Sequence, residues 1–292
     1  MGWKPCEVYK KRMKTIAVLL TVFNRKETTL RCLDNLFKQA IPEGYSLDVY
    51  LTNDGCTDGT PEAVREQFPQ VNIIEGNGSL FWNRGMWTAW DTAAKTKEYD
   101  FYLWLNDDTF LYDGAIEKLL ATSQKYKDQA IVVGPTESLD KSHTTYGGRI
   151  PQKGIPEVNG RDVKCITFNG NIVLFPKFVY DSIGNMDPYY GHSGGDTDYG
   201  YTATKRGVAI YQVGEHLGAC DEHPILSNWC NPNIPLRKRW KALHRPNGQP
   251  PREIFHLESK FFGIGKATFH YFTTYLHCVF PQLWGLLGKA RK

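Results

Sequence analysis

The feature that most constrains the fold of this chain is an alternation of short apolar runs with helical patterns. Residues 15–22 are almost entirely aliphatic or β-branched, which is typical of a strand buried on both faces of a sheet. Residues 27–40 then place Leu33, Leu36 and similar side chains at helical spacing. Further strands are expected at 47–52, 71–74, 99–105 and 130–133, and further helices after Pro61, at 82–96 and at 113–127. The alternation calls for right-handed crossovers and predicts an open, mostly parallel α/β sheet flanked by helices.

The rhythm changes after Pro135, where Gly, Pro and polar residues separate the expected elements. We expect a strand at 166–175, a helix near Lys177, a second helix at 196–206 and a last strand at 208–213. The second half of this domain is therefore predicted to be less regular than the first.

Composition and charge exclude several classes of protein. A hydrophobic content of 41% and a charged content of 23% in 292 residues exclude a disordered or collagen-like chain. The net charge of +4 is unevenly divided, because residues 231–292 carry eleven Lys and Arg against two Glu, a net +9, and the rest carries −5. The net negative charge of residues 1–230 argues against nucleic acid as a partner of the whole protein, whereas the net positive charge of residues 231–292 favours an anionic partner for that segment.

The cysteines and the N-terminal residues bear on the cellular compartment. Seven cysteines with no Cys-x-x-Cys pair argue against a disulfide scaffold or a zinc ribbon, and they fit a reducing compartment. The first apolar run, 16–23, is too short for a secretory signal. Met13 is a candidate start, which would make residues 1–12 an extension.

Polar and acidic side chains follow three of the expected strands, at 21–24, 52–55 and 106–108. Ligands of open α/β sheets bind beyond the carboxyl ends of the strands, so these residues are expected to share one site. The chain has neither a Gly-x-Gly-x-x-Gly turn nor a Walker phosphate loop. A bound diphosphate would therefore need another source of positive charge, such as a divalent cation held by carboxylates.

These segments resemble glycosyltransferase family 2 over roughly residues 14–220. The resemblance is carried by four motifs in the same order at the ends of the expected elements: Val22-Phe-Asn-Arg25, Asn53-Asp-Gly-Cys-Thr-Asp-Gly59, Leu105-Asn-Asp-Asp108, and Gly194-Gly-Asp-Thr-Asp-Tyr-Gly200 after Ile183-Gly-Asn-Met-Asp187. It implies a GT-A fold, a nucleotide-diphosphate sugar donor, Mn²⁺ or Mg²⁺ as cofactor, and inversion at the anomeric carbon. The GT-A catalytic domain would comprise residues 13–230, followed by a helical tail at 231–292.

The resemblance also assigns donor-binding residues. Thr21, Phe23 and Asn24 would border the base, and Asp54 would hydrogen-bond a pyrimidine. The segment around Trp82, Asn83 and Arg84 resembles the donor-side loop, with Trp82 walling the sugar site and Arg84 facing phosphate. Asp107 would contact the ribose or the donor sugar. The alternatives are a plain turn at Asp54, and core packing for Trp82 with Arg84 as a solvated cap.

The resemblance also assigns the metal ligands and the catalytic base. Asp108 and His216 would hold the cation, with His192 and His223 as less favoured histidines. Asp196 would be the base that deprotonates the acceptor hydroxyl. Asp198 is the fallback, because Gly195 stands where the family commonly has Glu.

The tail combines charge with aromatic residues. A basic cluster at 236–241 precedes an uncharged stretch, 267–288, that is long enough to span a bilayer. Because that stretch contains His270, His277 and Pro281, an interfacial helix pair on an anionic membrane surface is favoured over a span. The alternative is packing onto the catalytic domain or a partner subunit.

The resulting hypothesis is an inverting, metal-dependent glycosyltransferase of the kind that builds cell-surface polysaccharide. It would move a sugar from a UDP or dTDP donor to a glycan or lipid-linked glycan, at the cytoplasmic face of the cell membrane as a peripheral protein. One alternative is a sugar-1-phosphate nucleotidyltransferase, although the loop after the first strand lacks the glycines that such an enzyme needs. The other is a non-catalytic carbohydrate- or nucleotide-binding relative.

Overall fold

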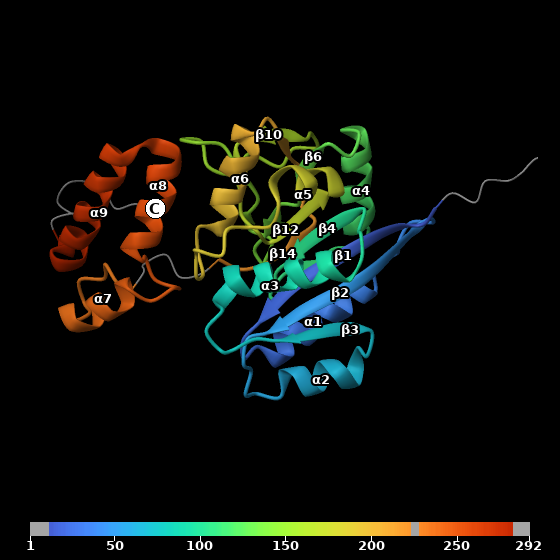
Figure 1. Ribbon diagram of the computed structural model, residues 1–292, viewed down its shortest axis with the longest axis horizontal. Helices are drawn as coiled ribbons and strands as arrows, with labels where there is room; N and C mark the ends of the chain where they lie inside the picture. The colour runs from blue at the N-terminus through green and yellow to red at the C-terminus, as the bar shows by residue number, and fades with distance from the viewer. Residues whose placement is uncertain (1–11, 223–227, 283–292) are drawn as a thin grey trace, which may run out of the picture.

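The computed structural model describes residues 12–222 and 228–282, so the proposed extension 1–12 and His223 lie largely or wholly outside the described residues. An eight-stranded mixed sheet forms the centre, with strands in the order β10-β13-β6-β12-β4-β1-β2-β3 (Figure 1). Their bounds are β1 Lys14–Val22, β2 Tyr45–Asn53, β3 Val71–Glu75, β4 Phe101–Leu105, β6 Ala130–Val133, β10 Val163–Cys165, β12 Ile172–Pro176 and β13 Ala209–Gln212.

Helices cover both faces of this sheet, as the alternating pattern predicts. Their bounds are α1 Lys26–Phe37, α2 Thr60–Gln67, α3 Phe81–Thr96, α4 Ala115–Lys125, α5 Lys177–Ile183 and α6 Gly195–Lys205. Successive residues of β1 point to opposite faces. Val18 and Leu20 therefore join the core beneath α1, α2 and α4, and Ala17 and Leu19 join the core beneath α3, α5 and α6.

The direction of the strands shows where the sequence prediction is incomplete. Strands β4, β1, β2 and β3 are parallel, as expected. The expected strand at 166–175 is divided into β11 Thr167–Phe168 and β12, and β12 runs antiparallel between β4 and β6. This reversal brings the segment before β12 to the same edge of the sheet as the end of β4.

Short strands form two smaller sheets beside this edge. Their bounds are β5 Phe110–Leu111, β7 Thr136–Glu137, β8 Thr144–Tyr146, β9 Gly148–Arg149 and β14 Gly218–Ala219. The sheet β5-β14-β7-β8 and the pair β11-β9 extend the wall around the ends of the central strands.

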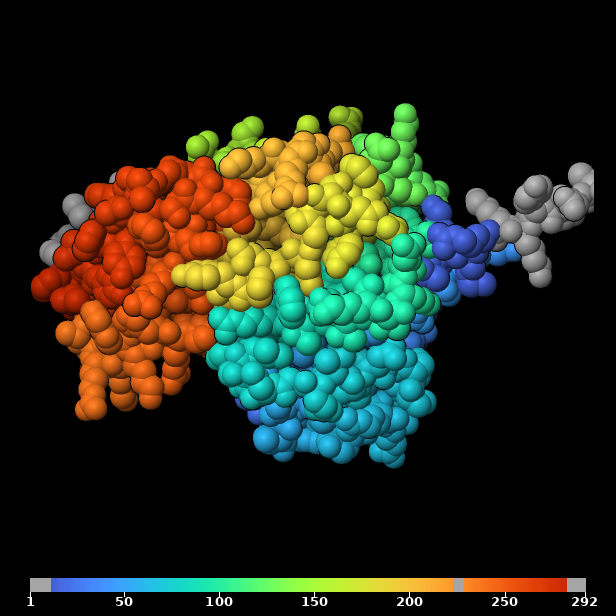
Figure 2. Space-filling view, viewed as in Figure 1, coloured from blue at the N-terminus to red at the C-terminus, as the bar shows by residue number. Residues whose placement is uncertain are grey.

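The tail forms three helices, α7 Leu236–Leu243, α8 Pro251–Phe262 and α9 Ile264–Val279. Figure 2 shows the tail, coloured orange to red, against one side of the α/β domain. The rings of Tyr189 and His256 stack at 4.2 Å across this boundary. Among residues 12–222 and 228–282, no helix combines the length and the apolarity needed to cross a membrane.

Candidate active site

Two adjoining pockets, of about 300 and 350 Å³, lie at the carboxyl ends of β1, β2 and β4. They share four lining residues: Arg25, Trp82, Asp107 and His192. The first pocket also contains Asp108 and Asp196 and is called the Asp196 pocket below. The second contains Thr21, Phe23 and Asp54 and is called the Asp54 pocket. The structure thus brings together seven of the eleven residues that the sequence assigns to the site.

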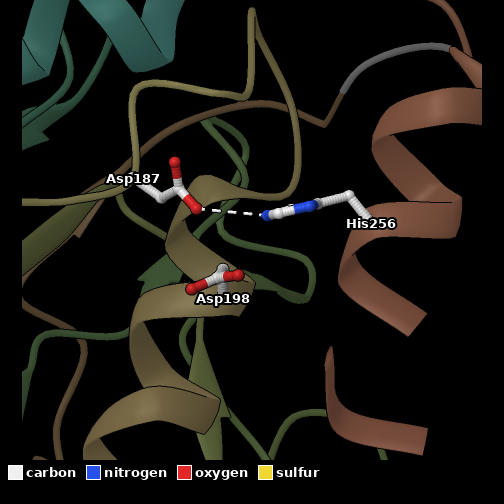
Figure 3. A group of neighbouring side chains, drawn as sticks. All are labelled: Asp187, Asp198 and His256. Atoms are coloured by element: carbon white, nitrogen blue, oxygen red, sulfur yellow. Dashed lines mark hydrogen bonds and ion pairs between the residues drawn. The ribbon is translucent and has the colours of Figure 1, made fainter. Parts of the chain in front are cut away.

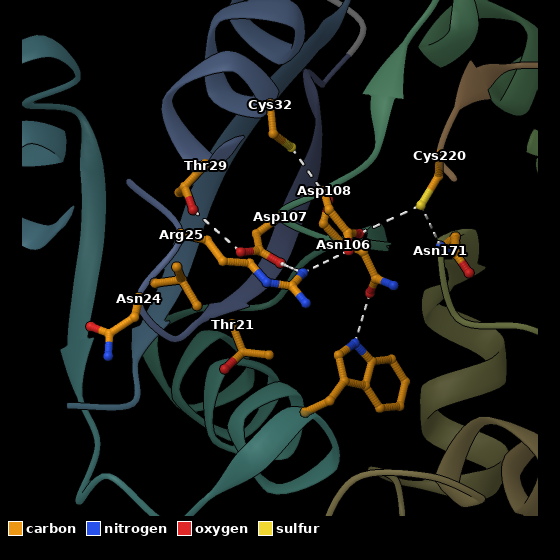
Figure 4. A network of polar contacts seen from close by, with 12 residues as sticks. Thr21, Asn24, Arg25, Thr29, Cys32, Asn106, Asp107, Asp108, Asn171 and Cys220 are labelled. Atoms are coloured by element: carbon orange, nitrogen blue, oxygen red, sulfur yellow. Dashed lines mark hydrogen bonds and ion pairs between the residues drawn. The ribbon is translucent and has the colours of Figure 1, made fainter. Parts of the chain in front are cut away.

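An Arg–Asp–Asp cluster forms the boundary between the two pockets (Figure 4). Arg25 Nη1 donates to Asp108 Oδ2 at 2.6 Å and to Asp107 Oδ1 at 3.3 Å, and the Thr29 hydroxyl donates to Asp107 Oδ2 at 3.3 Å. Burial, together with the charge of Asp108, raises the pKa of Asp107 to about 7, although Arg25 and Thr29 act in the opposite direction. Two neighbouring carboxylates therefore depend here on a nearby positive charge.

The same cluster fits a divalent cation. Asp107 and Asp108 present carboxylate oxygens at the end of a fully buried strand, and hard cations such as Mg²⁺ and Mn²⁺ prefer oxygen ligands. The pocket is open enough to admit a diphosphate beside them. In the protein without ligand, the Arg25 guanidinium supplies the positive charge that these carboxylates need.

Asp54 is buried directly after β2, and its carboxylate bonds the loop that leads into α3. Its Oδ1 accepts the N–H groups of Gly78 at 2.9 Å and Leu80 at 3.1 Å, and its Oδ2 accepts that of Phe81 at 2.8 Å. Phe81 has a left-handed backbone with φ of 57°, so these bonds hold a conformation that a bulky residue rarely adopts. Each carboxylate oxygen has two lone pairs, so Oδ2 retains acceptor capacity toward the pocket.

Replacing Asp54 by Ala is expected to lower the free energy of unfolding by about 3 kcal/mol, because three backbone N–H groups lose their acceptor. Urea unfolding measures this change. Asp113→Ala, at an exposed aspartate, is the matched control and should leave stability nearly unchanged. A loss below about 1 kcal/mol for Asp54→Ala would contradict the structural role of this carboxylate.

Asp196 projects from the first turn of α6 into the other end of the Asp196 pocket. Its Oδ1 accepts the N–H of Thr197 at 2.7 Å, and its Oδ2 accepts the N–H of Gly170 at 3.2 Å. Burial raises its pKa, while these N–H groups and the charge of Arg149 lower it. A carboxylate with a raised pKa that faces a pocket is suited to accept a proton near neutral pH.

Trp82 connects the two ends of the pocket. Its Nε1 donates to Asn106 Oδ1 at 2.7 Å, immediately before the Asp107–Asp108 pair. A Cβ on Gly170 would lie 2.6 Å from the Trp82 ring, so only glycine fits beneath the indole. The residue that donates to Asp196 therefore also supports the wall beside the acidic pair.

Four predicted site residues do not line either pocket. Asn24 accepts the N–H of Thr57 at 2.7 Å and joins two loops. The Nδ2 of Asn83 donates to the carbonyls of Asp187 and Tyr190 at 2.8 and 3.0 Å. The donor-binding roles of Asn24 and Asn83 stay predictions.

Arg84 and His216 also line neither pocket. Arg84 Nε donates to the carbonyl of Pro188 at 3.1 Å, so its guanidinium faces the loop after α5. His216 lies beside the small sheet, with Nε2 2.8 Å from Thr144 Oγ1 and Nδ1 3.4 Å from Glu137 Oε2. A contact with phosphate or a cation would require both side chains to move, and these two roles stay predictions.

The structure also adds residues to which the sequence assigned no role. Arg25 lies in the motif after β1, but its pairing with the acidic residues is visible only in the fold. His192, which was less favoured, lines both pockets. Its place four residues before Asp196, in a Gly-rich loop, is a signal that could have found it. Tyr146 and Asn169 reach the Asp196 pocket from the smaller sheets and the loop before β12, which no local pattern connects to the site.

Comparison with known proteins identifies the class. The sequence model described as "Glycosyl transferase family 2" matches residues 17–183, more than half of the chain. The chain therefore belongs to glycosyltransferase family 2 and is a nucleotide-sugar glycosyltransferase with a GT-A fold. Asp196 lies outside the matched residues, so its assignment depends on the geometry of the pocket.

Solved structures show the same fold at low sequence identity. The S. aureus TarS 1–349 crystal structure has a TM-score of 0.53 at 13% identity, covering 88% of this chain and 72% of that one. The crystal structure of TarS 1–349 in complex with UDP-GlcNAc has a TM-score of 0.54 at 12% identity, covering 85% of this chain and 82% of that one. A further crystal structure of S. aureus TarS has a TM-score of 0.55 at 12% identity. The match covers 86% of this chain and 43% of that one. No curated protein sequence matches the chain significantly.

Proposed function

We propose that this glycosyltransferase is inverting and cation-dependent, and that it uses a UDP- or dTDP-sugar as donor. One observation carries the proposal: the acidic pair Asp107–Asp108 and the carboxylate of Asp196 line the same pocket. Single displacement with inversion needs the leaving diphosphate on one side of the sugar and a base on the other, and a pocket that holds both kinds of group can supply this. Family membership favours sugar transfer over nucleotidyl transfer.

The donor would lie across both pockets. The Asp54 pocket would hold the nucleoside, with the remaining acceptor capacity of Asp54 directed at a pyrimidine N–H and Phe23 and Thr21 beside the base. The TarS complex with UDP-GlcNAc supports this class of donor through the shared fold. When bound, a divalent cation held by Asp108 and Asp107 would neutralise the charge that develops on the diphosphate.

The residues of the chain perform the remaining steps. Asp196 would accept the proton of the acceptor hydroxyl while the hydroxyl oxygen forms a bond to the anomeric carbon and the bond to the diphosphate breaks. Trp82 and Tyr146 present aromatic surface in the same pocket, which suits a sugar ring of the acceptor. This supports a glycan or lipid-linked glycan acceptor in polysaccharide synthesis.

A screen of nucleotide-sugar hydrolysis with Mn²⁺ tests the function without knowledge of the acceptor. We expect slow hydrolysis of one UDP- or dTDP-sugar and its loss in the presence of a chelator. If no nucleotide sugar binds or is hydrolysed, the proposed donor class is wrong. If hydrolysis is unaffected by the chelator, the cation dependence is wrong.

We further propose that the tail, residues 231–292, holds the catalytic domain, residues 13–230, on the inner face of the cell membrane. Phe269, Phe272 and Leu276 repeat at helical spacing on α9 and are 65%, 62% and 50% exposed. Trp240 of α7 lies beside α9, with its ring 5.3 Å from that of Tyr275. Exposed aromatic residues beside a +9 segment favour an anionic lipid surface over a neutral protein partner.

Flotation with liposomes that contain anionic lipid should recover the wild-type protein at low salt. The double variant Phe269→Ser/Phe272→Ser should reduce the recovered fraction by about tenfold or more, because burial of each ring in the membrane contributes roughly 2 kcal/mol. Phe178→Ser is the matched control, since Phe178 is 44% exposed on α5 of the catalytic domain. Recovery that is equal for all three proteins, or absent for the wild type, would contradict membrane binding by this face.

A further inference from the structure

A second group of titratable side chains lies where the tail meets the catalytic domain. Asp187, Asp198 and His256 bring potential ligand atoms within 4.8 Å of one another (Figure 3). Such a group is a candidate cation site. However, Lys260 Nζ lies 2.6 and 2.9 Å from the two carboxylate oxygens of Asp198. The ammonium of Lys260 therefore already supplies the positive charge, and a metal ion next to it would be repelled.

Asp198 depends on this lysine more than an exposed carboxylate would. Its side chain is 4% exposed, and its other partners are the hydroxyls of Tyr190 at 2.7 Å and Thr202 at 3.2 Å. Both are neutral. Leaving a buried carboxylate without a positive partner is strongly unfavourable. The tail, 62 residues further along the chain, thus neutralises a charge in the first turn of α6.

Helix α8 makes further contacts with the loop that leads into α6. His256 Nε2 lies 3.2 Å from Asp187 Oδ2, and its ring stacks on Tyr189. Glu253 accepts the backbone N–H of Gly191. This loop carries His192 into both pockets and enters α6 just before Asp196. One helix of the tail therefore contacts the loop and the helix that together present the proposed base.

We propose that Lys260 is a positioning residue for sugar transfer, acting through Asp198 to fix the first turn of α6 and thereby the carboxylate of Asp196. The inference rests on the proposed role of Asp196 as the base. Asp196 and Asp198 are two residues apart, so on a helix they point to nearly opposite sides. Lys260 binds the side that faces the tail, and Asp196 faces the pocket.

The consequence is a selective effect on turnover. Without the ammonium, the buried Asp198 carboxylate has to move or become protonated, and either change shifts the turn that carries Asp196. Displacement of a reacting group by about 1 Å costs on the order of 10²-fold in rate. The nucleotide would contact the Asp54 pocket, whose lining includes Asn247 as the one residue from the described part of the tail, so UDP affinity should stay within about twofold of wild type.

The test uses the full chain with Lys260→Met, measuring kcat and the dissociation constant for UDP separately. We expect kcat to fall by about 10- to 10²-fold with unchanged UDP affinity. Lys260→Arg, which keeps the charge, should restore most of the rate. Lys153→Met, at an exposed lysine between β9 and β10 of the catalytic domain, is the matched control and should behave as wild type. If Lys260→Met does not fold, Lys260→Gln, which still donates to Asp198, replaces it with the same expected direction.

The outcomes separate this inference from the proposed function. If Asp196→Asn lowers kcat but Lys260→Met does not, the positioning role is wrong and the base assignment stands. If Asp196→Asn keeps normal kcat, the proposed function of Asp196 fails first. Equal loss of kcat and UDP affinity in Lys260→Met, without rescue by Lys260→Arg, would show only a structural role. Titration with Mn²⁺ alone that finds a site lost in Asp198→Asn would overturn the assignment of the cluster to Lys260.

Discussion

Asp196→Asn is expected to lower kcat by a factor of about 10² to 10⁴ and to leave UDP affinity unchanged, because loss of a general base has an effect of this size. The variant keeps the shape of the side chain, although its one carbonyl oxygen can accept only one of the two N–H groups, those of Gly170 and Thr197, that bond the carboxylate. Initial rates and calorimetry with UDP measure the two quantities. A variant with nearly normal kcat, or one that cannot bind UDP, would give Asp196 another role.

The same substitution makes a prediction about stability. Burial raises the pKa of Asp196, so this carboxyl holds its proton more tightly in the folded than in the unfolded protein. Folding is therefore favoured by this group below its pKa and disfavoured above it. Asp196→Asn removes the cost of the buried charge but leaves one backbone N–H group without its acceptor, so its unfolding temperature should stay near that of wild type at neutral pH. Asp198→Asn, run in parallel, should lower that temperature, because Asp198 is paired with Lys260.

The pH dependence of the wild type follows from the same pKa. Transfer needs ionised Asp196, so kcat/KM should fall as the pH decreases through a value above the usual range for aspartate. The charged or titratable groups around Asp196 include Arg149, which acts against the shift, and His192, Arg25, Asp107 and Asp108, which line the same pocket. An acid limb at the usual pKa of an exposed aspartate would contradict the role of burial.

Asp108→Asn is expected to remove the dependence of UDP binding on a divalent cation. In the wild type, Mn²⁺ should tighten UDP binding by about tenfold or more, since a bound cation contributes several kcal/mol to a diphosphate. In the variant, affinities with and without Mn²⁺ should be nearly equal. The physical reason is that Asp108 supplies a carboxylate at the end of β4 that Asn does not replace as an anion.

Asp113→Asn serves as the control, because Asp113 is exposed beyond the pocket and carries the same change of charge. The measurement is calorimetry with UDP, with and without Mn²⁺, on the wild type, Asp108→Asn and Asp113→Asn. Equal dependence on Mn²⁺ in wild type and Asp108→Asn would place the cation elsewhere. Because Arg25 also contacts Asp107, its ion pair with the cluster should survive in the variant.

The sequence predicted the parallel half of the fold because its signals are local. Continuous apolar runs mark β1 and β4, and the polar residues that follow them meet wherever parallel strands end together. The grouping of Asp54 with the Asp107–Asp108 pair follows from this rule. The antiparallel insertion of β12 does not, since an apolar run carries no information about its direction.

The residues placed outside the pockets show the limit of motif reasoning. The orientation of α3 is fixed by close packing, because a Cβ on Gly85 would lie 2.1 Å from Thr21 Oγ1. This orientation directs Asn83 and Arg84 toward the loop after α5. A separate contact accounts for Gly195 at this position, since a Cβ there would lie 1.6 Å from Asn83 Oδ1. Such exclusions depend on the three-dimensional packing alone.

The tail shows the same limit at a larger scale. Its charge and aromatic content are visible in the sequence, but the pairing of Lys260 with Asp198 joins segments 62 residues apart. In the structure, α8 packs on the catalytic domain whereas the aromatic face of α9 is exposed. A single pattern of residues along the chain does not separate these two faces.

The anomeric configuration of the released sugar tests the central claim most directly. Proton NMR during the first minutes of donor hydrolysis, before the anomers equilibrate, distinguishes the two configurations. Asp196 acting as the base in the pocket that also holds the acidic pair predicts a product whose configuration is opposite to that of the donor. Release of a sugar with the configuration of the donor would contradict single displacement with Asp196 as the base.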